Sequence, residues 1–302
     1  MDALIPQRVR CDGTLGRWRR LRPIRSRATL AIVHGVIASA AIAFTTASVH
    51  AQPARSPLDR AHAHNDYEHA RPLHDALDRG FGSVEVDIWL VNGALLVAHD
   101  RDSVRIDRTL EGMYLAPLRA HIAARGGQVH TARPPLTLLV DIKSQADSTW
   151  AVLAPLLARY DDVLTSWRGD TMTVRAVVVV LSGKRPITTL PAQSKRWAAL
   201  DGRLDDLTAR RRTPAAAMPL VSDDWEKITT WRGVGTMPRA VRRRVAQAVS
   251  RAHAQGRRLR FWNTPDTPAV WQLLVECGVD LIGTDDLEAL RGFLTARTGL
   301  EK

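Results

Sequence analysis

Short apolar runs alternate with amphipathic stretches from Leu58 to the end of the chain. Short apolar runs bounded by polar residues indicate buried strands, whereas apolar residues spaced three and four apart indicate helices. The alternation of the two predicts a parallel sheet whose strands are joined by helical crossovers. A first predicted strand ends at His64, and the others comprise residues 83–90, 136–142, 174–181, 197–200, 218–221, 259–262 and 279–283.

Apolar residues recur at helical spacing between these runs and leave the opposite face polar. The stripes are Leu73, Ala76 and Leu77; Leu153, Leu156, Leu157 and Tyr160; Val241, Val245, Ala248 and Ala252; and Leu287, Leu290 and Leu294. Pro72 suits the first turn of the first helix, because that turn needs no amide donor there. Gly256 favours the end of the third helix, and Asp285 with Glu288 would cap the last one.

The number of strand and helix units predicts the fold class. Approximately eight such units in about 245 residues fit an α/β fold of the (β/α)8 TIM barrel type, whose sites lie at the carboxyl ends of the strands. A doubly wound open sheet is the alternative. No glycine-rich phosphate loop follows any predicted strand, which favours the barrel.

Residues 1–51 have the pattern of an export signal. Residues 1–28 are rich in arginine, residues 28–47 are almost free of charge, and Val49-His50-Ala51 supplies small residues before a cleavage point. We therefore expect a signal peptide, residues 1–51, followed by a barrel domain, residues 52–302, that is exported to the periplasm or secreted. The alternative is a retained membrane anchor, since about twenty apolar residues can span a bilayer. Cleavage would leave no stable membrane span.

The composition argues against disorder and against a nucleic-acid partner. Hydrophobic residues make up 45% of the chain, which is ordinary for a packed core. The formal net charge is +12, but residues 1–51 contain 8 Arg and 2 Asp, and the remaining 35 basic and 29 acidic residues leave only +6. The arginines that remain are mostly scattered. We expect a monomer that acts on a small-molecule or lipid substrate and binds no nucleic acid.

The cysteine content excludes a stabilising disulfide in the exported domain. Cys11 lies in the predicted signal, which leaves Cys277 without a partner. We expect Cys277 to be a buried small apolar residue rather than a reactive thiol.

Acidic side chains interrupt two of the predicted strands. Glu85 and Asp87 are two residues apart and share one face of a strand, and two adjacent carboxylates repel unless a cation lies between them. Oxygen ligands favour a hard divalent cation, Mg2+ or Ca2+. Asp141 and Lys143 end the next buried run with the same spacing, so both can face the same site.

Two histidines flank the acidic pair. His64 ends the first strand, and the tight-turn sequence Asn92-Gly93 returns the chain so that His99 comes close to the carboxylates. Imidazole titrates near neutral pH, so the two histidines could act as general base and general acid beside a metal. Spacing alone leaves His62 as a competitor of His64, because both lie on the same side of the strand.

In order and spacing, these residues resemble the phosphodiesterase superfamily that includes glycerophosphodiester phosphodiesterases and phosphatidylinositol-specific phospholipases C. Ala63-His64-Asn65-Asp66 is similar to the AHRG sequence of the former, Glu85-Val86-Asp87 to its E-x-D metal pair, His99-Asp100 to its second HD and Asp141-Ile142-Lys143 to its E-x-K. The run HNDYEHARPLHDAL resembles the branch named for altered inheritance of mitochondria protein 6. Asn65-Asp66 in place of Arg-Gly and Asp141 in place of Glu are departures from the pattern.

The resemblance implies a PLC-like phosphodiesterase barrel with one divalent cation, Mg2+ or Ca2+. The implied metal ligands are Glu85, Asp87 and Asp141; the catalytic residues are His64, His99 and Lys143; the substrate-binding residues are Asn65, Trp262 and Asn263. The implied reaction is the hydrolysis of a glycerophosphodiester or a phospholipid-type phosphodiester. The two histidine roles are open to exchange, and only the resemblance selects His64 over His62.

Two other classes of function stay open. The barrel could be a non-catalytic module that keeps the metal site to bind a phosphorylated or lipid ligand. It could also be a metal-dependent hydrolase of another bond, such as a sugar or amide. The absence from the sequence of a histidine-rich H-x-H metal set beyond His62 and His64 argues against a zinc amidohydrolase. Asp285 fits a helix cap and a site residue equally well and is not included in the predicted site. The tryptophans and glycines of residues 225–235 predict a mobile loop over the pocket.

Overall fold

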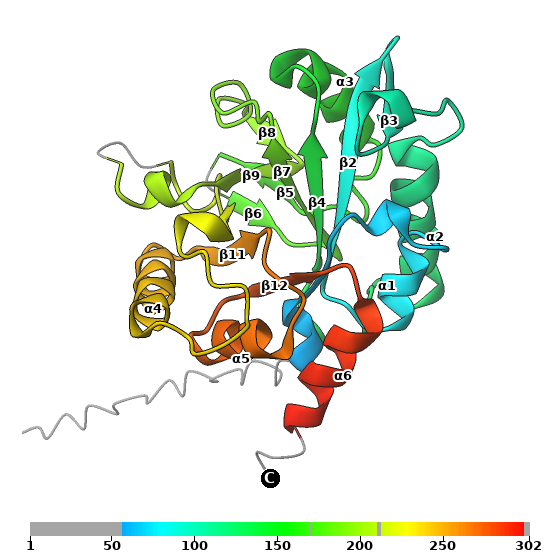
Figure 1. Ribbon diagram of the computed structural model, residues 1–302. Helices are drawn as coiled ribbons and strands as arrows, with labels where there is room; N and C mark the ends of the chain where they lie inside the picture. The colour runs from blue at the N-terminus through cyan, green and yellow to red at the C-terminus, as the bar shows by residue number, and fades with distance from the viewer. Residues whose placement is uncertain (1–55, 170, 210–212, 299–302) are drawn as a thin grey trace, which may run out of the picture. The chain divides into compact units, whose positions relative to one another are not determined.

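The computed structural model describes residues 56–169, 171–209 and 213–298 (Figure 1). The predicted signal peptide and the alternative membrane anchor lie outside the described residues. In the part of the chain that is described, none of the helices is both long enough and apolar enough to cross a bilayer.

The described residues form a closed barrel of eight parallel strands. These are β1 (Ala61–Ala63), β2 (Ser83–Val91), β4 (Leu136–Ile142), β7 (Val177–Gly183), β9 (Ala198–Gly202), β10 (Leu220–Asp224), β11 (Arg258–Trp262) and β12 (Leu281–Thr284). They pair in this order, and β12 pairs with β1, so that Ala63 lies between Thr284 and Val84. The (β/α)8 barrel is confirmed, and the open-sheet alternative is excluded.

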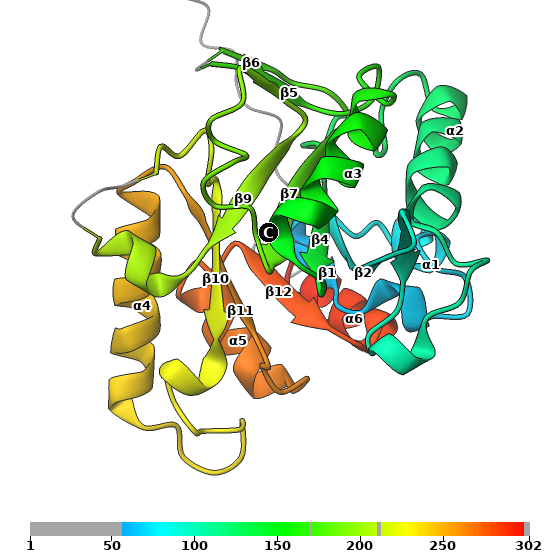
Figure 2. The same ribbon diagram turned by 90° about the horizontal axis from the view of Figure 1, so that it is seen from above.

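Helices cover the outside of the strands, as Figures 1 and 2 show. They are α1 (His74–Asp78), α2 (Ala116–Ala124), α3 (Ala146–Ala158), α4 (Arg239–His253), α5 (Pro268–Glu276) and α6 (Leu287–Thr298). The apolar stripes predicted for the third and fourth helices are buried on α4 and α6. Burial of these stripes against the sheet is what fixes the helices on a barrel.

The interior of the barrel changes from apolar to polar along its axis. Leu139, Val180, Leu220 and Leu281 come from four strands and form a separate buried cluster. Two residues further along the same strands stand Asp141, Ser182, Ser222 and Gly283, which are polar or small. The four apolar residues therefore form the floor on which a polar site stands.

Two short additions lie outside the barrel order. β3 (Ala94–Val97) pairs antiparallel with the end of β2, and the turn at Asn92 and Gly93 has positive φ at both residues, as a type I′ turn requires. This confirms the predicted hairpin. A three-stranded sheet of β5 (Ser166–Arg168), β6 (Thr171–Thr173) and β8 (Lys195–Arg196) was not predicted, because its strands are too short to show a pattern.

Two predicted helix starts are wrong. α1 begins at His74 rather than at Pro72, because Leu73 has a φ of 65° and its amide donates to the buried Asp66 carboxylate. In α6 the amide of Ala289 donates to Asp286 Oδ1 at 2.9 Å, so Asp286 rather than Asp285 caps the helix. Asp285 is thereby free for another contact.

Two smaller predictions also need correction. The strand predicted from Val174 begins at Val177, because Val174 is exposed and follows the β6 edge strand. Cys277 is half-buried rather than buried, and its Sγ lies 3.8 Å from the carbonyl oxygen of Arg242.

Candidate active site

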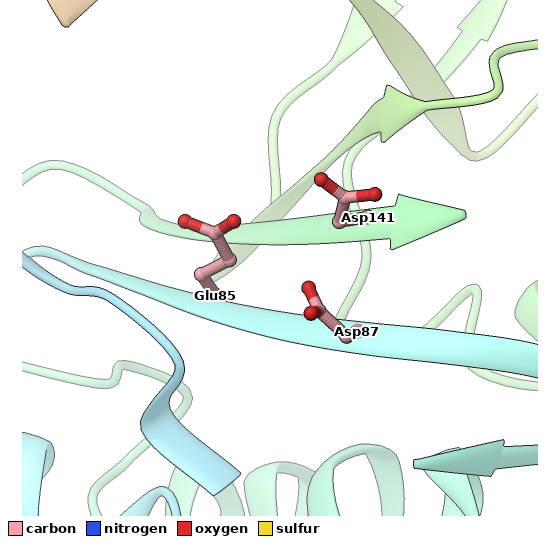
Figure 3. Close-up of side chains that lie close together, drawn as sticks. All are labelled: Glu85, Asp87 and Asp141. Atoms are coloured by element: carbon pink, nitrogen blue, oxygen red, sulfur yellow. The ribbon is translucent and has the colours of Figure 1, made fainter. Parts of the chain in front are cut away.

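Three carboxylates meet at the carboxyl ends of β2 and β4. Glu85 and Asp87 lie on β2, and Asp141 on β4 is in register with Asp87. Each offers an oxygen that lies within 4.8 Å of the others, and Figure 3 shows the side chains on one side of the two strands. Glu85 and Asp87 are buried and Asp141 is half-buried. The predicted metal ligands are therefore brought together.

The hydrogen bonds of Asp87 leave one of its oxygens without a partner. Its Oδ2 is 2.7 Å from the Tyr67 hydroxyl, 3.0 Å from His99 Nδ1 and 3.0 Å from Lys143 Nζ. Its Oδ1 is buried and accepts no hydrogen bond from the described residues, and the same holds for Asp141 Oδ1. Buried carboxylate oxygens without partners are costly unless a cation binds them. The donor set therefore fits one divalent cation with oxygen ligands.

Glu85 is fixed by two buried cationic or donor groups. His62 Nε2 is 2.9 Å and Arg260 Nη2 is 2.5 Å from Glu85 Oε2. Burial alone would raise the pKa of Glu85, but the charge of Arg260 and the hydrogen bond from His62 hold it well below its usual range. Glu85 is thus ionised and held in place before any cation arrives.

In the other two carboxylates the compensating groups do not outweigh burial, so both pKa values are raised. Burial raises the pKa of Asp141 to about 6; the charge of Lys143 opposes this shift, and the charges of Asp87 and Glu85 add to it. Burial and the charge of Glu85 also raise the pKa of Asp87. A cation at this position would favour the ionised form of both groups.

Lys143 bridges the two aspartates. Its Nζ is 3.0 Å from Asp87 Oδ2 and 3.6 Å from Asp141 Oδ1. Burial lowers the pKa of Lys143, whereas the charges of Asp141 and Asp87 raise it. The net effect is a pKa above the ordinary value, so the ammonium stays charged. Lys143 lies where it can meet an anionic substrate beside the acidic triad.

His64 is held by the carboxylate of Asp285, a residue that was not included in the site predicted from the sequence. Its Nδ1 is 2.7 Å from Asp285 Oδ1. A carboxylate only accepts, so Nδ1 carries the proton of the neutral ring and Nε2 keeps a lone pair. His62, in contrast, is fully buried between Ser83 and Glu85, and burial with the charge of Arg260 lowers its pKa to about 4. Of the two histidines, His64 lines the pocket over the triad, whereas His62 is buried beneath it.

His99 is held in the same way by a carboxylate of the triad. Its Nδ1 is 3.0 Å from Asp87 Oδ2, and the indole nitrogen of Trp89 donates to the backbone oxygen of Ala98 just before it. The β2–β3 hairpin brings His99 to this place, as the turn sequence predicted. Each histidine thus donates from Nδ1 to a carboxylate and keeps Nε2 for proton transfer.

An open pocket of about 300 Å3 lies over the triad. Its walls are formed by His64, Asn65, Glu85, His99, Asp141, Lys143, Ser182, Arg203, Arg260 and Trp262. Of the predicted substrate-binding residues, Asn65 and Trp262 line this pocket. Asn263 lines an adjoining pocket that shares His64, Arg260 and Trp262 with the first.

Several residues of the site were missed by the sequence argument. Tyr67 contacts Asp87 and Asn65, Arg260 pairs with Glu85, and Asp285 orients His64. The signal that identified Asp141, a charge inside an apolar strand, also applies to Arg260 in the run Leu259–Trp262. For Tyr67 the only signal was its place in the run that resembles a known family.

The prediction of a mobile loop over residues 225–235 is wrong for the first part of that segment. Trp225 is fully buried and belongs to the core. Its ring packs edge-on against that of Phe261, with 5.7 Å between the ring centroids. A Cβ at Gly233 would lie 2.4 Å from Thr267 Oγ1, so the later part of the loop packs closely against the start of α5. Trp231 donates its indole hydrogen to Val234 within the loop.

Replacing Gly183 with alanine is expected to weaken cation binding by about 10- to 100-fold. Gly183 has a φ of 64°, and a Cβ there would lie 2.0 Å from Asp141 Oδ1, so the carboxylate would have to move. Titration calorimetry with Mg2+ and with Ca2+ measures the effect. Gly126→Ala is the control, since Gly126 has a similar φ of 65° and its added Cβ would meet no other part of the described chain within 4 Å. Equal affinity in the folded Gly183→Ala protein would contradict the placement of the ion at Asp141.

Replacing Asp285 with asparagine is expected to lower the pKa of His64. Burial lowers this pKa, but the hydrogen bond to Asp285 and the charge of Glu85 outweigh it and hold the pKa above its ordinary value. Without the anionic acceptor the imidazolium is less stable, so the limb of the pH–rate profile that belongs to His64 moves to lower pH. The loss of a charged hydrogen bond also lowers kcat/KM by roughly 10- to 100-fold.

The pH dependence of kcat/KM and an NMR titration of the His64 ring measure both effects. Asp286→Asn is the control, because Asp286 caps α6 and does not contact His64. Two unchanged limbs in Asp285→Asn would show that this contact does not set the protonation of His64.

Family models match two separate parts of the chain. Residues 56–200 match the AIM6-like phosphodiesterase domain, and residues 258–288 match the glycerophosphoryl diester phosphodiesterase family. The first match covers β1 to β9 with the acidic triad, and the second covers β11 and β12 with Arg260 and Asp285. The predicted resemblance is therefore confirmed.

Curated relatives cover most of the barrel domain. Altered inheritance of mitochondria protein 6 of Eremothecium gossypii is 29% identical over 279 residues, with 78% of this chain and 69% of that protein covered. The homolog from Arthroderma benhamiae is 26% identical over 268 residues, with 77% of this chain and 82% of that protein covered. The names of these relatives state no reaction.

A glycerophosphodiester phosphodiesterase is among the solved structures that resemble this chain. The crystal structure of a glycerophosphodiester phosphodiesterase from Parabacteroides distasonis has a TM-score of 0.49 and 15% identity, with 79% of this chain and 98% of that chain covered. The assignment of a closed barrel rests on the strand order of this protein.

Proposed function

We propose that this protein, which matches the AIM6-like phosphodiesterase domain over residues 56–200, hydrolyses a glycerophosphodiester or a phospholipid-type phosphodiester with one divalent cation. The observation that carries the proposal is the pocket itself. It brings together three carboxylates, a lysine and two histidines. Two of the carboxylates have a buried oxygen that accepts no hydrogen bond from the described residues, and each histidine donates its Nδ1 hydrogen to a carboxylate.

The charges around the triad suit an anionic substrate once the cation is bound. Three carboxylates, Arg260 and Lys143 together carry one net negative charge. A divalent cation changes this to one net positive charge, which matches the single negative charge of a phosphodiester. When bound, the cation polarises the phosphoryl group and offsets the charge that develops on its oxygens. Mg2+ and Ca2+ are the candidates for an all-oxygen site.

The two histidines supply the proton transfers. One accepts a proton at Nε2 from the attacking hydroxyl while the new bond from that oxygen to phosphorus forms. The other donates a proton from Nε2 to the ester oxygen whose bond to phosphorus breaks. A water molecule as nucleophile gives a monoester directly, whereas a hydroxyl of the substrate gives a cyclic phosphate first. Lys143 stabilises the negative charge on the phosphoryl oxygens.

The test is hydrolysis after removal and return of metal. The protein is treated with a chelator and assayed on bis(p-nitrophenyl) phosphate and a panel of glycerophosphodiesters, with and without added Mg2+ or Ca2+. We expect activity that requires the ion and disappears in Glu85→Gln, because that variant loses a fixed charge at the triad. Glu68→Gln, an exposed residue, is the control.

Inactivity of the wild-type protein on every diester would overturn the proposal. If the cation still bound with unchanged affinity in that case, the barrel would be a metal-binding module without catalytic activity. Hydrolysis that persists after the metal is removed would contradict the role of the triad.

A further inference from the structure

An arginine forms the wall of the pocket opposite His64. Arg203 directly follows β9, and β9 lies four strands from β1 in either direction around the closed barrel. Its half-buried side chain lines the same pocket as the acidic triad and the two histidines. A group bound at the triad therefore has His64 on one side and Arg203 on the other.

The guanidinium of Arg203 is fixed through one nitrogen. Its Nη1 donates to Asp201 Oδ2 at 2.9 Å, to the carbonyl oxygen of Gly202 at 2.8 Å and to that of Ser222 at 3.4 Å. Every hydrogen bond of this side chain to a described residue uses Nη1. Nε and Nη2, which form one edge of the planar group, remain for a ligand.

The carboxylate that holds Arg203 is itself fixed. Asp201 is fully buried, and its Oδ2 also accepts a hydrogen bond from the hydroxyl of Ser182 at 2.8 Å. Ser182 is in register with Asp141 on the neighbouring strand. The network therefore links the position of Arg203 to the strand that carries a predicted metal ligand.

Charged groups of both signs lie on this side of the pocket. The guanidinium of Arg185 donates to the backbone oxygen of Asp201, and the Asp206 carboxylate accepts a hydrogen bond from the amide of Arg203 at 2.7 Å. The nearby Asp223 is matched by Lys227 at 3.0 Å. Burial and the charge of Arg203 lower the pKa of Arg185, against the opposing charges of Asp201, Asp206 and Asp223. Of the two arginines, Arg203 is the one that lines the pocket.

We propose that Arg203 binds the phosphate of the substrate through Nε and Nη2, from the side of the pocket opposite His64. The inference rests on the proposed function, because it concerns the same substrate. With the triad on β2 and β4, Lys143 directly after β4 and Arg203 directly after β9, two non-bridging oxygens of a diester are held from two directions. A planar fork that contacts two oxygens gives orientation as well as charge.

The test is binding of inorganic phosphate to the full protein with saturating Mg2+, measured by titration calorimetry. We expect the Kd for phosphate to rise at least about tenfold in Arg203→Met, because a charged hydrogen-bonded contact is lost. Arg203→Lys should show a smaller rise, since it keeps the charge but not the fork. Arg243→Met is the control, because it removes the same charge from the exposed face of α4. The affinity for Mg2+ without phosphate should be equal in all variants.

Kinetics separate this inference from the proposed function. If the wild-type protein cleaves diesters, kcat/KM should fall about tenfold or more in Arg203→Met. If it cleaves none, the proposed function fails, and the phosphate titration still decides the role of Arg203. Equal phosphate affinity in Arg203→Met and wild type, or no phosphate binding by wild type, would overturn the inference. If Arg203→Met does not fold, an unchanged Kd in Arg203→Lys overturns it and a raised Kd supports it.

Discussion

Replacing Asp87 with asparagine is expected to lower kcat/KM for phosphodiester hydrolysis by at least about a thousandfold, since it disturbs both cation binding and proton transfer. Asp87 Oδ2 accepts hydrogen bonds from the Tyr67 hydroxyl, His99 Nδ1 and Lys143 Nζ. Its Oδ1 is buried and accepts no hydrogen bond from the described residues. An amide must place its NH2 group toward one of these two sides. It therefore faces either three donors or the cation, and both arrangements are repulsive.

Steady-state kinetics and titration with Mg2+ or Ca2+ measure the two losses separately. Tyr67→Phe removes only one of the three donors and is expected to cost roughly 10- to 100-fold in kcat/KM. Asp102→Asn is the matched control, because Asp102 is an exposed residue of the segment after His99. Activity of folded Asp87→Asn within tenfold of wild type would exclude Asp87 as both a cation ligand and the group that orients His99.

The parts of the site that the sequence could predict are local in the chain. Glu85 and Asp87 are two residues apart on one strand, so the period of a strand places them on one face without knowledge of the fold. Asn92-Gly93 specifies its own turn, and that turn brings His99 to Asp87. Parallel pairing of the next strand then adds Asp141 in register.

The parts that the sequence could not predict depend on closure of the barrel. Arg260 pairs with Glu85 across 175 residues, and Asp285 contacts His64 across 221 residues. Asp285 stands at a strand end, which was a signal for the site, but a helix cap was an equally local explanation for an acid before α6. The cap is Asp286, one residue later, and a difference of one residue is below the accuracy of a spacing argument.

Backbone conformation accounts for another part of the missing information. Leu73 adopts a φ of 65° that bulky residues rarely adopt, and only the buried Asp66 carboxylate, which accepts its amide hydrogen, explains why α1 starts after it. Asp66 Oδ2 also accepts a hydrogen bond from the Tyr114 hydroxyl at 2.9 Å. This acid lies next to Asn65 in the sequence but serves the fold rather than the pocket.

Replacing each histidine with alanine is expected to lower kcat/KM for an alkyl phosphodiester by roughly 100- to 10,000-fold, the usual contribution of a general acid or base. The two variants should then differ on a p-nitrophenyl ester. Because p-nitrophenolate leaves without a proton, the variant that lacks the general acid regains most of its activity on this substrate. The variant that lacks the general base stays slow on both. The comparison of His64→Ala with His99→Ala therefore assigns the two roles, which the symmetrical contacts of their Nδ1 atoms leave equivalent.

His64→Ala should also bind the cation with wild-type affinity, because His64 contacts Asp285 and none of the three triad carboxylates. His99→Ala removes a donor from Asp87, so its cation affinity should fall. His74→Ala is the control for both, since His74 is exposed on α1 in the same segment of the chain. If both variants lost the same factor on the alkyl and on the p-nitrophenyl ester, neither histidine would protonate the leaving group. The proton would then come from another source, with Lys143 and Asp141 as ionisable residues that line the same pocket.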